Sequence, residues 1–329
     1  MRTVDWSDLS NWRKACLAVF AVLVVAAALT ISLIVTQQSD TEQTYPQEAD
    51  ASNNTASNIS TDNKFADNNA QELATLQPKP LFFFLGDSIT EEAIDPAKGG
   101  YIPLLVNKVS RSADVVAHGL SGYTTRWVLK YAMPVVEDEI KSHTFTPTLV
   151  TIWFGTNDAV IMNGSRAEKH VPVDSYKENL VEIVRRFQTL VPAADILLVT
   201  PPHVDDAAQL KHAEEDTGKW NGVVDRSNAR SGMYARACVE TAKAIDIPVL
   251  DLYSYFNAMN ASTRNALLWD GLHFSPEGHE IVVELFLNKT QSEFPAVAKA
   301  LDSWKIISSS VLSERDPWVP PSSTNETAS

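Results

Sequence analysis

Five short apolar runs alternate along this chain with longer segments of helical periodicity. The runs expected as strands are 81–85 (LFFFL), 114–117 (DVVA), 148–154 (TLVTIWF), 195–200 (DILLVT) and 247–251 (IPVLD). Helices are expected at 101–110, 124–142, 174–190, 228–244 and 277–288. Runs that are apolar on both faces suit the interior of a parallel sheet covered by helices. The alternation therefore predicts an α/β fold, a three-layer α/β/α sandwich around a five-stranded parallel sheet.

An apolar segment near the N-terminus is long enough to cross a membrane. Ala15 to Val35 contains 21 residues without a charge or a proline, which as a helix would span roughly 31 Å, the thickness of the hydrocarbon core. A cleaved signal peptide has a shorter apolar stretch, about 7 to 15 residues. A retained anchor is therefore favoured over cleavage and over a buried core helix. We expect one transmembrane signal anchor over residues 15–36.

Positive charge lies on only one side of this segment. Arg13 and Lys14 directly precede it, and no Lys or Arg follows until Lys64. The positive-inside rule then predicts a cytosolic N-terminus over residues 1–14, with all later residues in the secretory lumen or outside the cell. N-glycans are added in that compartment, and six Asn-x-Ser/Thr sequons agree with this orientation: Asn53, Asn58, Asn163, Asn260, Asn288 and Asn325.

Composition divides the rest of the chain into three parts. Residues 37–78 are rich in Gln, Asn, Ser, Thr, Asp and Glu and hold no apolar cluster, which predicts a disordered polar stalk. Residues 308–329, with several Pro and Ser, are expected to form a disordered tail. The alternating strands and helices between them leave one globular domain over residues 79–307.

Several classes of function are disfavoured by what the sequence holds and lacks. The formal net charge of −14 argues against nucleic-acid binding, which needs a basic surface. Neither the P-loop motif GxxxxGK[ST] nor GxGxxG occurs, and HExxH and CxxC do not occur either. These are the common signatures of nucleotide and metal sites, so we expect no cofactor and no metal ion.

Small polar residues follow the predicted strands. They are Gly86-Asp87-Ser88 after the first strand, HGLSGYTT with Gly119, Ser121 and Gly122 after the second, Gly155-Thr156-Asn157-Asp158 after the third, and, beyond the fifth, Asp270-Gly271-Leu272-His273. Taken singly, each has an ordinary structural explanation. Ser88 with Glu91 three residues later is an acceptable capping box for a helix. Asn157 could cap a loop, and Asp270 with His273 could be a surface pair.

Taken together, these residues fit one mechanism. A serine nucleophile needs a base within hydrogen-bond reach, and the base needs a carboxylate to orient it. Asp270 and His273 can supply both groups from one turn, with Ser88 as the nucleophile. The oxyanion formed on attack needs convergent N–H donors, which the backbone amides of Ser88 and Gly122 and the side-chain amide of Asn157 could provide.

The residues of these motifs and their order along the chain resemble those of the SGNH (GDSL) hydrolase superfamily, and within it the isoamyl acetate-hydrolysing esterase family. The resemblance covers roughly residues 80 to 300 and rests on GDSITEE, SGYTTRW, GTNDAV, HVPVDSYKENL, LLVTPP and DGLHFSPEGHE. It implies a flavodoxin-like α/β/α fold and the hydrolysis of carboxylic, often acetyl, esters. Carried over by position, Ser88 is the nucleophile, His273 the base and Asp270 its partner, while Ser88, Gly122 and Asn157 form the oxyanion hole.

Three functions stay open at this point. The leading one is a membrane-anchored serine esterase that acts on a small ester, with an acetyl or other short acyl group. The second, from the same superfamily, is a glycan O-deacetylase or a lysophospholipase. The third is a catalytically silent binding module on a stalk, which the loss of a triad residue would favour, and here all three residues are present.

Overall fold

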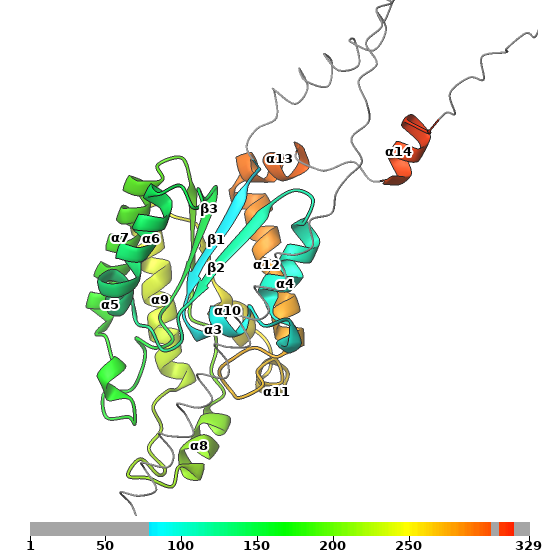
Figure 1. The fold of residues 1–329 in the computed structure, drawn as a ribbon. Coiled ribbons are helices and arrows are strands. Elements are labelled where there is room, and N and C mark those ends of the chain that lie inside the picture. The colour runs from blue at the N-terminus through cyan, green and yellow to red at the C-terminus, as the bar shows by residue number, and fades with distance from the viewer. Residues whose placement is uncertain (1–78, 304–308, 319–329) are drawn as a thin grey trace, which may run out of the picture. The chain divides into compact units, whose positions relative to one another are not determined.

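The computed structural model describes residues 79–303 and 309–318, drawn as a ribbon in Figure 1. The expected cytosolic segment, anchor and stalk lie outside these residues, as do the sequons at Asn53, Asn58 and Asn325, so these expectations remain predictions. Among the helices that the structure does describe, none is long and apolar enough to cross a membrane.

Five parallel strands form the centre of the domain. They are β1 (Leu81–Gly86), β2 (Asp114–Gly119), β3 (Leu149–Trp153), β4 (Asp195–Val199) and β5 (Val249–Leu250). Their spatial order is β2-β1-β3-β4-β5, and every neighbouring pair is parallel. In this register Leu85 of β1 lies between His118 of β2 and Ile152 of β3. The predicted α/β fold with a five-stranded parallel sheet is confirmed.

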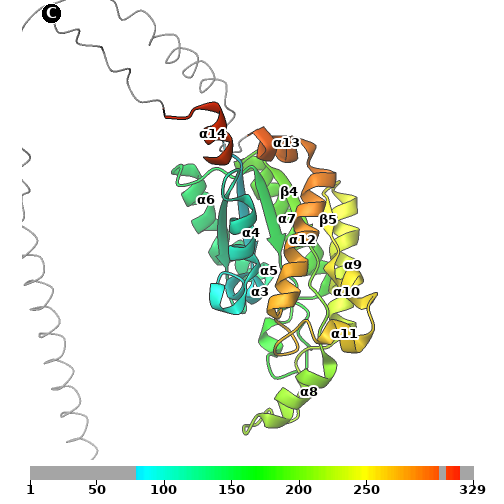
Figure 2. The same ribbon diagram turned by 90° about the vertical axis from the view of Figure 1, so that its right-hand side faces the viewer.

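The apolar run of β1 supplies a separate core on each face of the sheet, because successive side chains of a strand point to opposite faces. Phe83 and Leu85 pack into one core, and Phe82 and Phe84 into the other. The first face is covered by α6 (Met133–Lys141), α7 (Val173–Leu190) and α9 (Asn228–Ala244). The second is covered by α4 (Tyr101–Val109) and α12 (Pro276–Glu293), which Figure 2 shows side by side.

The observed elements differ from the predicted ones where proline intervenes. The helix predicted over 124–142 divides into α5 (Thr125–Trp127), a π-helical turn η2 (Val128–Ala132) and α6. Pro134 at the start of α6 has no N–H to donate to the preceding turn, so the α-helical ladder is interrupted there. The strand predicted over 247–251 shortens to β5, because Pro248 cannot donate to a neighbouring strand and Asp251 is the N-cap of α10 (Leu252–Asn257).

Several helices were not expected from the sequence. They are α8 (Asp206–Glu215), α10 (Leu252–Asn257), α11 (Ala261–Asn265), α13 (Pro295–Ser303) and α14 (Ser309–Arg315), whereas the capping box at Ser88 already allows for the helix α3 (Ser88–Glu92). Most are short, and the apolar periodicity that marks a helix is weak over one or two turns. The helix α14 lies in the segment 308–329 that was expected to be disordered, so that expectation is wrong for 309–315.

The carboxyl ends of β1 and β2 are held together by a close approach. A Cβ added at Gly119 would lie 2.2 Å from the backbone nitrogen and the Cα of Glu91 in α3. Only a glycine therefore lets the end of β2 pack against the helix that carries Ser88. This contact brings the polar residues that follow β1 close to those that follow β2.

Candidate active site

Ser88 is the first residue of α3, and only Asp87 separates it from the end of β1. The carboxylate of Asp87, which is 1% exposed, accepts a hydrogen bond from the backbone N–H of Ile89 at 3.0 Å. Asp87 is therefore the N-cap of α3, and the capping role considered for Ser88 is wrong. The Ser88 hydroxyl is left free for another contact, and its backbone N–H has no carbonyl partner in the first turn of the helix.

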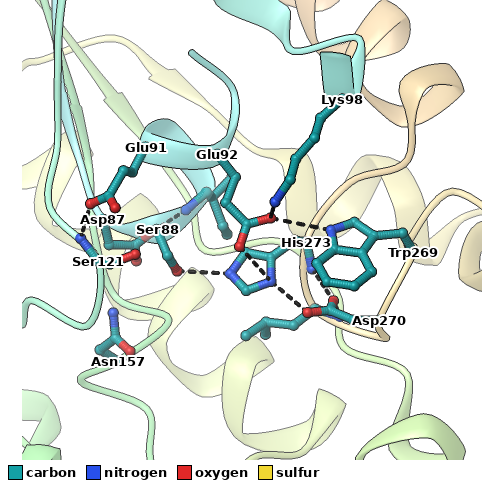
Figure 3. Close-up of polar contacts among 12 residues, drawn as sticks. Asp87, Ser88, Glu91, Glu92, Lys98, Ser121, Asn157, Trp269, Asp270 and His273 are labelled. Atoms are coloured by element: carbon teal, nitrogen blue, oxygen red, sulfur yellow. Dashed lines mark hydrogen bonds and ion pairs between the residues drawn. The ribbon is translucent and has the colours of Figure 1, made fainter. Parts of the chain in front are cut away.

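The Ser88 hydroxyl contacts His273, which lies 185 positions later in the chain. His273 Nε2 is 2.8 Å from Ser88 Oγ, and His273 Nδ1 is 2.7 Å from Asp270 Oδ2. Figure 3 shows these three side chains in one row. The structure thus brings together the serine, histidine and aspartate that the sequence singles out.

A tight turn orients the aspartate and the histidine. The second oxygen of the Asp270 carboxylate accepts the backbone N–H groups of Leu272 and His273, at 2.9 and 2.8 Å. A β-bridge between Leu268 and Phe274 closes the loop around them. Asp270 therefore fixes both the backbone and the imidazole of His273, so the pair is built into the fold and is not a surface pair.

The surroundings of His273 favour its protonated form. Burial lowers the pKa of the imidazole, but the hydrogen bond to Asp270 and the charges of Asp270, Glu92 and Asp87 outweigh it, and the pKa lies above its usual 6.5. Burial raises the pKa of Asp270, and here the hydrogen bonds from His273 and Leu272 prevail, so the pKa lies below 3.8. Asp270 is ionised at neutral pH and stabilises a positive charge on His273.

Glu92, at the end of α3, is a second carboxylate beside the imidazole. Its Oε1 lies 3.7 Å from His273 Nδ1. Its Oε2 accepts hydrogen bonds from Lys98 Nζ at 3.1 Å and from Trp269 Nε1 at 3.2 Å, and the Trp269 ring stacks on the imidazole (Figure 3). No pattern in the sequence points to Glu92, which reaches His273 only through the folding of the 267–275 loop.

Gly122 lies in a tight turn after β2. The backbone N–H of Tyr123 bonds the carbonyl of Leu120 at 3.0 Å, and Gly122 has a φ of +78°, as the third residue of a type II turn requires. The carboxylate of Glu91 accepts the N–H of Ser121 at 2.7 Å. The helix α3 therefore holds both Ser88 and the Gly122 turn.

Asn157 follows β3 and is 2% exposed. Its side-chain Nδ2 donates to the carbonyl of Tyr123 at 3.0 Å, and its Oδ1 accepts from Arg226 Nη2 at 2.8 Å. Arg226 is itself 7% exposed and also donates to Asp225 at 2.8 Å. These two contacts fix the orientation of the Asn157 amide. They use only one of the two N–H groups on Nδ2, so the other can donate to a ligand. No motif in the sequence marks Arg226 as a partner of Asn157.

The neighbouring Asp158 has a structural role. It is fully buried, and its carboxylate accepts hydrogen bonds from the backbone N–H and the hydroxyl of Thr125. Burial raises its pKa to about 7, against the effect of these bonds. Asp158 therefore fastens the loop after β3 to the start of α5 and keeps Asn157 at the end of the strand.

Ser88 and His273 line a cavity of about 500 Å³. The segments 159–173 and 202–227 supply further walls. From them the cavity receives Arg166, Lys169, His212, Trp220 and Arg226. His203 does not line the cavity: it lies fully buried, with its Nε2 2.8 Å from the carbonyl oxygen of Arg264.

The chain is similar in sequence to known proteins. The sequence pattern of the GDSL-like Lipase/Acylhydrolase family matches residues 84–281. A GDSL esterase/lipase of Arabidopsis thaliana is 38% identical over 64% of this chain and 86% of its own length. The isoamyl acetate-hydrolyzing esterase 1 homolog of Rattus norvegicus is 33% identical over 70% of this chain and 88% of its own length.

Among solved structures, the lipase/acylhydrolase from Enterococcus faecalis is similar to the chain with a TM-score of 0.49 and 24% identity, over 65% of this chain and 96% of that one. The assignment rests on the family pattern and the sequence relatives. They confirm the resemblance carried by GDSIT, GTND and DGLH, and with it the expectation of a hydrolytic esterase. The chain belongs to the GDSL-like Lipase/Acylhydrolase family.

Proposed function

We propose that this protein is a serine esterase that hydrolyses carboxylic esters of acetyl and other short acyl groups, with Ser88 as the nucleophile. One observation carries the proposal: the hydrogen bonds from Ser88 Oγ to His273 Nε2 and from His273 Nδ1 to Asp270 Oδ2 form one chain, at 2.8 and 2.7 Å. A serine hydroxyl is a weak nucleophile until an adjacent base takes its proton, and the base works best when a carboxylate orients it.

The first half of the reaction forms an acyl-enzyme. Ser88 Oγ attacks the ester carbonyl carbon while its proton passes to His273 Nε2, and the carbonyl oxygen becomes an oxyanion. When this tetrahedral intermediate collapses, the bond to the alcohol oxygen breaks, and His273 gives its proton to the leaving alcohol. Asp270 stabilises the imidazolium throughout, which agrees with the raised pKa of His273.

The second half repeats these steps with water. His273 takes a proton from the water as it attacks the acyl-enzyme, the new oxyanion forms at the same place, and the bond to Ser88 Oγ breaks with return of the proton to the serine. In both halves the oxyanion accepts hydrogen bonds from the backbone N–H groups of Ser88 and Gly122 and from Asn157 Nδ2.

The cavity and the relatives support a small ester as the substrate. A volume of about 500 Å³ is within the ordinary range for small-molecule sites. Relatives in rat, mouse, cattle and human are isoamyl acetate-hydrolyzing esterase 1 homologs. The charged walls do not suit the long chain of a lysophospholipid. The second candidate function is therefore O-deacetylation of a glycan. It is the same reaction on a larger alcohol, which would lie beside Trp220 of the cavity wall.

Replacing the nucleophile tests the proposal. We expect Ser88→Ala to lower kcat for p-nitrophenyl acetate by about 10⁴-fold or more, and His273→Ala almost as much. The double variant should be hardly slower than either, because members of one catalytic unit are strongly non-additive. Thermal unfolding checks that each variant is folded. A folded Ser88→Ala protein that retains substantial turnover would refute the mechanism.

The pH dependence of kcat/KM tests the role of His273. The base acts in its neutral form, so activity falls as the pH falls through the pKa of His273. Because that pKa is raised, we expect the acidic limb of the profile above pH 6.5. Glu92→Gln removes a carboxylate 3.7 Å from Nδ1 and should move the limb to lower pH. Glu284→Gln, an exposed position on α12, should not. An unmoved limb in Glu92→Gln would contradict this electrostatic account.

A double-mutant cycle tests how Asn157 is held. Asn157→Ala should lower kcat by about 100- to 1000-fold, the usual loss for one oxyanion donor. Arg226→Met should also lower kcat in the wild-type background, since Asn157 then loses its orientation, but should change little in the Asn157→Ala background. Arg236→Met, at an exposed position on α9, is the control. Equal losses from Arg226→Met in both backgrounds would show that Arg226 acts independently of Asn157.

A further inference from the structure

Lys169 lies beside the catalytic groups but has no part in the mechanism above. It is the last residue of the short 3₁₀ helix η3 (Ala167–Lys169), in the segment between β3 and α7. A Cβ added at Gly122 would lie 2.7 Å from Lys169 Nζ. The ammonium group therefore fills the space above Gly122, on the wall of the cavity that Ser88 and His273 also line.

The ammonium group of Lys169 has no ion pair or hydrogen bond within the described part of the chain. Asp225, the carboxylate on this side of the cavity, already pairs with Arg226 at 2.8 Å and with Arg166 at 3.4 Å. Two arginines thus share one carboxylate, and Lys169 adds a further positive charge. This wall carries more positive than negative charge, although the chain as a whole is acidic.

The environment of Lys169 is unfavourable for its charge. The side chain is half-buried, and burial together with the charges of Arg166 and Arg226 lowers its pKa, which the charges of Glu168 and Asp225 offset only in part. A partly desolvated charge without a partner costs free energy that an anionic ligand would recover.

Carboxylates gather around His273. Asp270 and Glu92 lie against His273, and Glu92 remains close to the imidazole through Lys98 and Trp269. Asp216, after α8, also lines the cavity, and its carboxylate accepts the N–H of Gly218. An anionic group on a substrate would therefore be attracted to the unpaired Lys169, and the carboxylates near His273 would not attract it.

We propose that the preferred substrate is an ester with an anionic substituent, a carboxylate or a phosphate, which pairs with Lys169 while the ester carbonyl lies at Ser88. This inference rests on the proposed esterase function and names its substrate class. The charge separation across the cavity would fix the orientation of such an ester. The ionised group can belong to the alcohol half or to the acyl half, and the two cases are separable by experiment.

Matched pairs of esters test the inference. Phenyl acetate and 4-acetoxybenzoate differ by a carboxylate on the alcohol half, while methyl hexanoate and methyl hydrogen adipate differ by one on the acyl half. A pH-stat follows the hydrolysis of each by the full-length protein. We expect kcat/KM to favour the anionic ester in at least one pair, and added NaCl to weaken that preference. The pair that responds identifies the half that carries the charge.

Variants of Lys169 connect the preference to this residue. Lys169→Met should lower the ratio of anionic to neutral kcat/KM by about tenfold, the loss for one charge-assisted contact, mainly through KM. Lys169→Glu should lower the ratio further, because it adds repulsion. Lys108→Met, an exposed lysine on α4 outside the cavity, is the matched control and should leave the ratio as it is.

Two results would overturn the inference. The first is a wild-type protein that hydrolyses the neutral esters with no preference for either anionic one, which would leave the serine esterase mechanism in place. The second is an equal loss on neutral and anionic esters in Lys169→Met, which would mean that the ammonium acts on the common oxyanion. A protein inactive on all four esters would overturn the proposed function together with this inference.

Discussion

The arrangement of the site depends on the parallel pairing of β1 with both β2 and β3. Because parallel strands end at the same edge of a sheet, the residues after these three strands become neighbours, although they are far apart in the chain. Ser88, the Gly122 turn and Asn157 all come from this edge. Asp87 caps α3 and Glu91 accepts a hydrogen bond from the Gly122 turn, so one short helix sets the positions of Ser88 and of that turn.

Charge is distributed unevenly around the cavity. This distribution bears both on the proposed proton transfer at His273 and on the binding of a charged ester. Around His273, the carboxylates of Asp270 and Glu92 favour the protonated imidazole, which the proposed proton transfer would create. On the other wall, Arg226 orients the amide of Asn157, while Lys169 remains without a partner in the described chain. The carboxylates near His273 support the proposed proton transfer, and Lys169 supports the proposed preference for an anionic ester.

Much of the fold and the centre of the site could be predicted from the sequence, because both leave local patterns. Strands buried on both faces read as apolar runs, and polar residues at their ends mark the edge where ligands bind. Glu92, Arg226 and Lys169 leave no such pattern. Each lies in a polar segment typical of a solvated surface, and only tertiary contacts bring it to His273, Asn157 or Gly122.

The central claim is that Ser88 is the nucleophile, and covalent labelling tests it most directly. A serine-directed fluorophosphonate should add one group per molecule of the wild-type protein. Peptide mass spectrometry should then place that group on the segment containing GDSIT, because only a serine with an adjacent base attacks phosphorus readily. Folded His273→Ala should label far more slowly, and Ser88→Ala should not label. A modification at another serine, or an Ser88→Ala protein that labels like the wild type, would contradict the account.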